Sequence, residues 1–286
     1  MIAQRAIRDA TALDDAEWLD THFAACQPEY EAQLRAVGIK QGWHVLDAGC
    51  GGGSHLPLLA ELVGPSGKIA AFDLEQANLD AALALLSRLD CPSPVVPQRG
   101  SITALPYPDN AFDAVWCANV VQHLDDAALA VALAEFRRVV RPGGLVAVKD
   151  MDMSLWRIAP ADPLLIAALS RASLREREST AARETHGSLR GRTLRSYLNG
   201  AGLAETWQRT TLIERWQPLR PVERRLWTEW LAHLAALAGA RGLAGEELAG
   251  WEAVADADAP GHPLNDPNCY LCEGQVLAVG RVPARE

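Results

Sequence analysis

The feature that most constrains the fold is an alternation of two patterns between residues 43 and 151. Five β-rich runs that are apolar almost throughout alternate with runs that carry apolar residues at helical spacing. The β-rich runs are WHVLDAG, KIAAFDL, PVVPQRG, FDAVWCAN and GLVAVKDM. Strands of this kind are covered on both faces, as in parallel sheets flanked by helices. The alternation therefore predicts a doubly wound α/β sheet, in which the run that carries Pro97 is either an edge strand or contains a bulge.

The segments around this core predict one domain over residues 1–286, with helical additions. We expect seven strands in a mostly parallel sheet, with the last strand antiparallel. The predicted parts are a helical cap (1–40), a ligand-binding core (41–151), two helical lid insertions (152–192 and 217–268) and the remaining sheet (193–216 and 269–286).

Composition narrows the classes of partner. The net charge is −9 and Lys and Arg form no basic stripe, so neither nucleic acid nor an anionic membrane is an expected partner. No apolar run approaches the roughly 20 residues that span a bilayer. The first ten residues, MIAQRAIRDA, lack the apolar centre of a signal peptide. We therefore expect a soluble, cytoplasmic protein, and its oligomeric state stays open.

Six cysteines are predicted to be free thiols. Cys269 and Cys272 have C-x-x-C spacing, but they lie in an apparent strand. Residues three apart on a strand point to opposite faces, so this pair is not expected to bind zinc or form a disulfide. No carboxylate set with metal-ligand spacing is present either, so no metal is expected.

The strongest chemical signal is the run VLDAGCGGGSH at residues 45–55. A strand leads into glycines and then a helix, which lets a ligand approach bare backbone at a helix N-terminus. A dinucleotide loop of the form G-x-G-x-x-G would need glycine at position 54, where this chain has Ser54. Asp73 ends the next strand, 24 residues after Gly49, where a carboxylate can accept hydrogen bonds from ribose hydroxyls.

With these residues, the stretch from Trp43 to Asp150 resembles a class I S-adenosylmethionine-dependent methyltransferase of the UbiE-like, small-molecule type. Four segments in the family's order carry the resemblance: VLDAGCGGGSH, AAFDLEQANLDAAL, GSITALPYPDNAFDAVWCANVVQHL and EFRRVVRPGGLVAVKD. The resemblance implies a Rossmann-like fold, S-adenosylmethionine as cofactor, S-adenosylhomocysteine as product, and a small-molecule acceptor.

The resemblance also implies positions for cofactor contacts. Asp47, Gly49 and Gly51 would line the methionine and ribose portion, and Asn119 and Val120 would contact the methionine end.

Further contacts follow for the nucleoside part of the cofactor. Asp73 would hold the ribose hydroxyls, Leu74 would lie against the adenine, and Ser101 and Ile102 would contact the adenine. The family usually has an acid at the position of Ser101. The adenine amino group would therefore be held by a weaker bond or by backbone.

Two residues are candidates for helping the chemistry. The sulfonium already activates the methyl group, so transfer depends mainly on positioning, and a base matters only when the acceptor must lose a proton. His123 follows the fourth predicted strand at the sheet edge where such folds bind ligands. Tyr30 lies on the N-terminal helix, where it would cap the cofactor or orient the substrate. The alternatives are a packing or capping role for His123 and a core aromatic role for Tyr30.

Candidate acceptor contacts are Trp156, Asp150 and Asp152. Tryptophans in the predicted lid favour an aromatic or nitrogen-heterocyclic acceptor of specialised metabolism, although a lid-core role for Trp156 is an equal alternative. The two aspartates would hold a cationic or N–H group, or else belong to a solvated loop. Whether carbon, nitrogen or oxygen receives the methyl stays open. The alternative functions are a cofactor-binding regulatory protein without turnover and, less favoured, an NAD-dependent oxidoreductase.

Overall fold

The computed structural model describes residues 16–89, 91–179 and 187–284. Its contacts divide the chain into two compact units. The core unit draws on Gln27–Met151, Thr185–Thr211 and Gln275–Glu286, and the accessory unit on Met1–Cys26, Asp152–Glu184 and Leu212–Gly274. The expectations for residues 1–15 of the predicted cap and 180–186 of the predicted lid lie outside the described residues.

The core unit is built on the predicted doubly wound sheet. Strands β1 to β5 run parallel in the order β3-β2-β1-β4-β5, and β8 joins antiparallel to β5. The mostly parallel α/β prediction is thus confirmed, as is the edge position of Pro97 in β3. The strand bounds are β1 His44–Ala48, β2 Lys68–Asp73, β3 Val95–Arg99, β4 Phe112–Ala118, β5 Val140–Met151, β7 Ala204–Trp216, which pairs with β8, and β8 Tyr270–Arg281.

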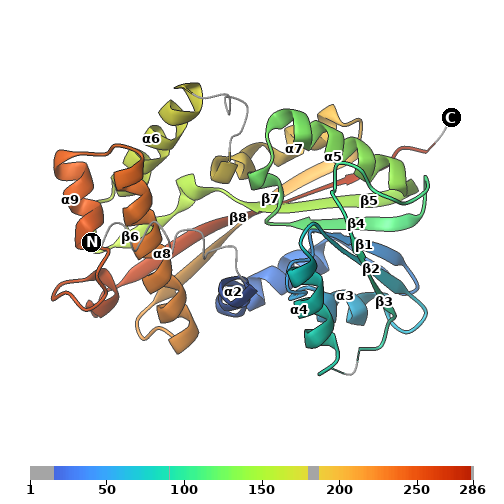
Figure 1. Ribbon diagram of the computed structural model, residues 1–286, viewed down its shortest axis with the longest axis horizontal. Helices are drawn as coiled ribbons and strands as arrows, with labels where there is room; N and C mark the ends of the chain where they lie inside the picture. The colour runs from blue at the N-terminus through green and yellow to red at the C-terminus, as the bar shows by residue number, and fades with distance from the viewer. Residues whose placement is uncertain (1–15, 90, 180–186, 285–286) are drawn as a thin grey trace. The chain divides into compact units, whose positions relative to one another are not determined.

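Helices cover both faces of this sheet because the apolar strand residues alternate between two cores. Leu46 of β1 belongs to one core, together with residues of α5 (Asp126–Val139) and α7 (Leu194–Gly200). Val45 belongs to the other, with α3 (Leu56–Val63), α4 (Gln76–Leu86) and the core-unit end of α2 (Ala16–Ala36). Figure 1 shows α5 and α7 on one side of β4 and β5, and α3 and α4 on the other.

The accessory unit contains one strand that the sequence did not predict. Arg157–Ala159 forms β6, which pairs antiparallel with β8, Arg157 opposite Cys272. The sheet therefore has eight strands rather than the predicted seven, because β6 lies within the segment 152–192 that was expected to be helical. Three residues are too few to show a period-two pattern, so β6 depends on pairing with β8.

Most of the accessory unit is nevertheless helical, as Figure 1 shows for α6, α8 and α9. Besides the first part of α2, its described helices are η3 Met153–Leu155, α6 Leu165–Ser179, α8 Pro221–Ala240, α9 Gly245–Ala253 and η5 Pro263–Asn265. No helix among the described residues is long and apolar enough to cross a bilayer. None of the six cysteines, all of which lie among the described residues, forms a disulfide, as predicted.

A buried arginine fixes the chain that follows β4. Arg190 lies in η4 (Gly187–Thr193), and its guanidinium is fully buried. It donates hydrogen bonds to the Val121 carbonyl, to the Leu124 carbonyl at 2.7 Å and to Asp126 Oδ1 at 2.7 Å. These bonds satisfy carbonyls around η2 (Val121–His123) and tie this turn to the start of α5.

Candidate functional site

The glycine loop after β1 has the predicted strand–loop–helix form, and α3 begins at Leu56. Gly49 and Cys50 each donate a backbone hydrogen bond to the Phe72 carbonyl, at 2.7 and 3.0 Å. Gly49 has φ +83°, and a Cβ placed on it would lie 2.4 Å from Val120 Cγ2. Only glycine fits here, since the turn is left-handed and the backbone lies against Val120.

Asp73 ends β2 beside this loop with its carboxylate already oriented. Oδ2 accepts a hydrogen bond from Gly51 N at 2.9 Å, and Oδ1 accepts from Glu75 N and Asn78 Nδ2, both at 3.0 Å. A carboxylate offers about four lone-pair sites, so capacity remains for a ligand hydroxyl. Leu74 is 58% exposed and offers apolar surface next to Asp73. The sequence interpretation missed Asn78.

Asp47, near the end of β1, is buried, and its Oδ2 has no hydrogen-bond partner among the described residues. Burial first, and the negative charge of Asp73 second, raise the pKa of Asp47 to about 8. A cationic group placed beside Asp47 would both satisfy this oxygen and favour the ionised carboxylate. The arrangement is therefore suited to a positively charged ligand.

The ends of β2 and β3 also meet at this edge. Gly100 N donates to the Asp73 carbonyl at 2.9 Å, which brings Ser101 and Ile102 next to the loop. The Ser101 hydroxyl lies 2.7 Å from Thr103 Oγ1 and accepts from Thr103 N at 3.3 Å, so it forms a local turn. Ile102 is buried in the core.

Asn119, directly after β4, is held in an unusual conformation by Lys149. Its φ is +60°, a region that asparagine tolerates better than most residues. Asn119 N donates to the Lys149 carbonyl at 2.8 Å, and Lys149 Nζ donates to Asn119 Oδ1 at 2.7 Å. The sequence interpretation missed Lys149, although a charge at the end of the apolar run GLVAVKDM was a visible signal.

Tyr30 lies inside a buried cluster rather than on a surface. Lys149 Nζ is 3.5 Å from the centre of its ring, and the ring stacks on His55 with centroids 6.1 Å apart. His55 packs edge-on against Trp116 at 5.3 Å. Burial, followed by the charge of Lys149, lowers the pKa of His55 to about 3. The imidazole is therefore neutral at physiological pH.

His123 is exposed on η2, and Asp150 supports the turn that carries it. Asp150 is fully buried, and its carboxylate accepts from Gln122 N and Met151 N, both at 2.8 Å. Burial raises the pKa of Asp150 to about 6, against the lowering effect of these hydrogen bonds.

Asp152 and Trp156 belong to the accessory unit and have local partners there. Asp152 Oδ1 accepts from Ser154 N at 3.0 Å and from Ser154 Oγ at 2.7 Å, and so caps η3. Trp156 is buried, with its ring centre 5.5 Å from that of Trp227 and 5.1 Å from that of Trp230.

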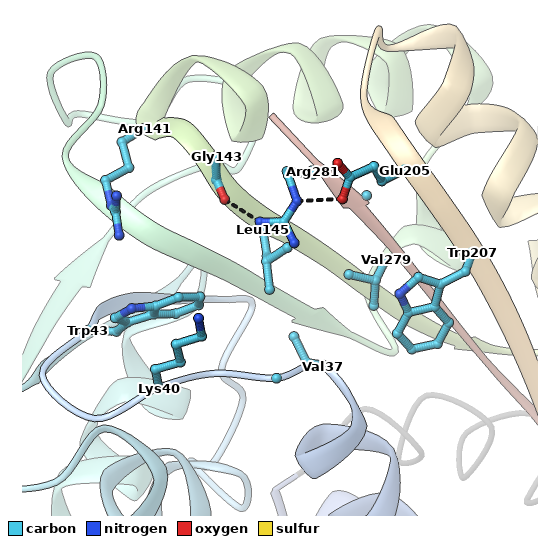
Figure 2. Close-up of a pocket in the computed structure, with 12 residues that line it drawn as sticks. Val37, Lys40, Trp43, Arg141, Gly143, Leu145, Glu205, Trp207, Val279 and Arg281 are labelled. Atoms are coloured by element: carbon cyan, nitrogen blue, oxygen red, sulfur yellow. Dashed lines mark hydrogen bonds and ion pairs between the residues drawn. The ribbon is translucent and has the colours of Figure 1, made fainter. Parts of the chain in front are cut away.

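A cavity of about 370 Å³ lies at the other edge of the core-unit sheet, where β1 and β5 begin. Figure 2 shows Lys40 and Trp43 on one side of it, and Arg281 bonded to Glu205 and to the Gly143 carbonyl. Because Gly49, Asp73 and Asn119 follow the carboxyl ends of parallel strands, this cavity is distinct from the candidate site.

Comparisons with known proteins agree with this geometry. A family model described as a methyltransferase domain matches residues 45–144. The chain is 33% identical over 202 residues to the "probable S-adenosylmethionine-dependent methyltransferase" of Mycolicibacterium smegmatis, covering 68% of this chain and 72% of that protein. The chain belongs to the S-adenosylmethionine-dependent methyltransferases. The family confirms the resemblance stated from the sequence, and S-adenosylmethionine is the cofactor of this family.

Other relatives match over shorter lengths. The 2-phytyl-1,4-naphthoquinone methyltransferase of Synechococcus elongatus is 35% identical over 126 residues, which is 44% of this methyltransferase and 51% of that protein. The YcgJ protein of Bacillus subtilis has the same fold, with TM-score 0.54, 19% identity and coverage of 90% of this chain and 100% of that chain. This methyltransferase spans 39%, 64% and 51% of the lengths of three curated relatives.

The site residues fit the cofactor of the family. S-adenosylmethionine carries a positively charged amino group and sulfonium, which match the buried Asp47 oxygen that no described residue hydrogen-bonds. Asp73 is oriented to receive ribose hydroxyls, and Gly49 and Gly51 of the neighbouring glycine loop are partly exposed. The methyltransferase thus brings together Asp47, Gly49, Gly51, Asp73 and Val120 at one sheet edge.

The raised pKa of Asp47 predicts a specific pH dependence of stability. The unfolded carboxyl loses its proton near pH 3.8 and the folded one near pH 8, so the folded state binds more protons between these values. Stability therefore falls as pH rises through this window. We expect Asp47→Asn to remove this pH dependence. The free energy of unfolding of the variant should therefore rise relative to that of the wild type by up to about 1.4 kcal/mol for each pH unit in this window. Urea unfolding at pH 5, 6, 7 and 8 measures it, and parallel pH profiles would contradict it.

The contact between Gly49 and Val120 predicts a second effect. Gly49→Ala should cost about 1–3 kcal/mol of stability and weaken S-adenosylhomocysteine binding, because the new methyl group displaces Val120. Gly38→Ala is the matched control, since Gly38 has φ +86° and open space around its Cβ position. Urea unfolding and calorimetric titration of both variants separate backbone strain from the close contact. Equal losses in the two variants would show that the Val120 contact contributes nothing.

Proposed function

We propose that the chain transfers the methyl group of S-adenosylmethionine to a small aromatic or nitrogen-heterocyclic acceptor. The observation that carries the proposal is the buried Asp47 Oδ2, which has no hydrogen-bond partner in the described part of the chain and lies one strand away from the oriented Asp73 carboxylate. When bound, the cofactor supplies a methyl group already activated by its sulfonium. The chain's own task is then to bind, to orient and to accept a proton where the acceptor carries one.

Each residue has a defined part in this proposal. Asp47 holds the amino group of the cofactor, Asp73 holds the ribose hydroxyls, and Leu74 covers the adenine. Asn119 contacts the methionine end. Its side chain accepts a hydrogen bond from Lys149 Nζ, and its backbone N–H donates one to the Lys149 carbonyl, so both are fixed. The fixed Asn119 would help to position the methyl group for in-line displacement, a reaction that depends mainly on positioning.

Two observations support an aromatic acceptor. The Synechococcus elongatus relative is named for a naphthoquinone, an aromatic bicycle. In this chain, Trp156 Nε1 is buried and has no hydrogen-bond partner among the described residues. A hydroxyl or carbonyl of an acceptor would satisfy that N–H, and the ring would lie against indole faces. The chain between 152 and 268, beyond the cofactor core, suits a specialised rather than a general acceptor.

His123 is the proposed proton acceptor, because its side chain is exposed on the turn that follows β4. The buried Asp150 carboxylate holds this turn in place by accepting a hydrogen bond from Gln122 N. Tyr30 is proposed to act through its ring, which holds Lys149 and His55 in place, rather than through an exposed hydroxyl.

The first experiment tests cofactor and turnover together. The purified chain is titrated calorimetrically with S-adenosylhomocysteine and with NAD, and then assayed with a panel of phenols, quinols and nitrogen heterocycles. Micromolar binding of S-adenosylhomocysteine and methylation of one acceptor class support the proposal. Binding without any turnover would favour a regulatory protein that keeps the cofactor. Binding of NAD alone would favour an oxidoreductase.

Removal of the proposed proton acceptor should lower turnover but not cofactor binding. We expect His123→Ala to reduce kcat about 10²-fold or more for an acceptor that loses a proton, with an unchanged Kd for S-adenosylhomocysteine. His123→Gln keeps a polar side chain and should lose the same activity. The measurement is kcat between pH 6 and 9, and wild-type kcat in both variants throughout that range would exclude His123 from proton transfer.

Loss of the Trp156 N–H should weaken acceptor binding selectively. We expect Trp156→Phe to raise KM for the acceptor about tenfold, the equivalent of about 1.4 kcal/mol, because the ring stays but the hydrogen bond is lost. Trp251→Phe is the matched control, since Trp251 is also a buried accessory-unit tryptophan whose indole N–H has no partner among the described residues. Steady-state kinetics of both variants test this, and equal KM values would remove Trp156 from the acceptor site.

A further inference from the structure

A cluster of three different metal-binding side chains lies in the accessory unit, outside every residue used above. His22 and Cys26 come from α2, and Glu273 comes from β8. Their exposed fractions are 3%, 2% and 1%. His22 Nε2 lies 3.4 Å from Glu273 Oε2, and Cys26 Sγ donates to Glu273 Oε1 at 3.0 Å. An imidazole nitrogen, a thiol and a carboxylate thus converge in the interior.

The geometry of the cluster suits a tetrahedral ion. His22 and Cys26 are four residues apart on one helix, so their side chains leave from the same face. One ligand atom from each of the three residues lies within 4.8 Å of the other two. Zinc bound to nitrogen and oxygen at about 2.1 Å separates these two ligand atoms by about 3.4 Å, the edge of a tetrahedron. The His22–Glu273 separation is already 3.4 Å.

Charge also favours a divalent ion here. The Cys26 thiol would lose its proton on binding, so a thiolate and a carboxylate would balance the two positive charges. The neutral assembly is the form that a buried position tolerates best. The ring of Trp18 lies 5.0 Å from the His22 ring and that of Trp230 lies 6.4 Å from it, so indole rings shield one side of the cluster.

We propose that His22, Cys26 and Glu273 form a zinc site. Nitrogen, sulfur and oxygen donors together are typical of zinc, and three protein ligands leave a fourth position for water or a small donor. Bound zinc would link α2 to β8 within the accessory unit. The proposal is independent of methyl transfer, and its test does not require turnover.

The sequence predicted no metal because Cys26 and Glu273 are 247 residues apart in the chain. The C-x-x-C pair, which drew attention instead, contributes no ligand, and Cys272 Sγ points to the Leu155 carbonyl at 3.7 Å. Only the spacing of His22 and Cys26 in HFAAC was visible, and two residues at helical spacing do not define a site.

The test is metal titration of the full chain after treatment with a chelator. With Co²⁺ as probe, we expect one equivalent to produce a thiolate-to-cobalt absorption band in the near ultraviolet, and one equivalent of Zn²⁺ to abolish it. Cys26→Ser should lose the band, and His22→Gln and Glu273→Gln should weaken Zn²⁺ binding at least tenfold. Cys269→Ser, which changes another buried cysteine of the accessory unit outside the cluster, should keep the band and the affinity.

A second readout guards against variants that do not fold. Zn²⁺ should raise the thermal midpoint of the wild type and of Cys269→Ser, but not that of Cys26→Ser, because an ion that binds only the folded state stabilises it. The proposal is overturned if the wild type gives no thiolate band and binds Zn²⁺ no more tightly than roughly 10 µM, an affinity of about 7 kcal/mol. Retention of the band in Cys26→Ser would also overturn it.

Discussion

The close approach of Gly49 to Val120 is the constraint on which the candidate site depends. It requires β1 and β4 to end at the same level, and the parallel register delivers this by placing Leu46 opposite Ala70 in β2 and Val115 in β4. Strand ends that coincide put their following loops into one place. The carboxyl groups of Asp47 on β1 and Asp73 on β2 and the turn after β4 therefore lie together at the carboxyl ends of the strands.

The alignment of these strand ends also explains why the ionised form of the Asp47 carboxyl is unfavourable in the unliganded protein. The register that aligns β1 with β2 brings two carboxyl groups into one buried region. Three donors surround Asp73, whereas Asp47 Oδ2 has no hydrogen-bond partner among the described residues. The pKa of Asp47 is raised because burial disfavours the ionised carboxylate more than the neutral carboxyl, and the charge of Asp73 adds to this effect. The buried Asp47 carboxyl lowers the free energy of unfolding of the unliganded protein at neutral pH. A cationic ligand bound beside it would offset this loss, so ligand binding and protein stability are coupled through Asp47.

Sequence reasoning succeeded where the information is local. Apolar runs predicted the strands of the core, Pro97 limited β3 to an edge strand or a bulge, and β7 lies within the segment 193–216 that was expected to belong to the sheet. It failed where a contact joins distant segments. The three residues of β6 carry no pattern of their own, and the stack of Tyr30 on His55 needs α2 to pack beside the start of α3. Asp150 lies buried inside β5 rather than in a solvated loop, and its hydrogen bonds to the Gln122 and Met151 backbones appear only in the fold.

Charged residues inside apolar strands are a sequence signal that predicts contacts with distant segments of the chain. Lys149 follows four apolar residues within the run GLVAVKDM, and Glu273 interrupts CYLCEGQVLAVG. Both side chains are buried. Burial of a charge is unfavourable unless partners compensate it, so such a residue predicts partners elsewhere in the chain. Lys149 has Asn119 and the Tyr30 ring, at the edge where the cofactor residues gather. Glu273 has His22 and Cys26. The same physical rule thus leads, from two strands, to two different sites.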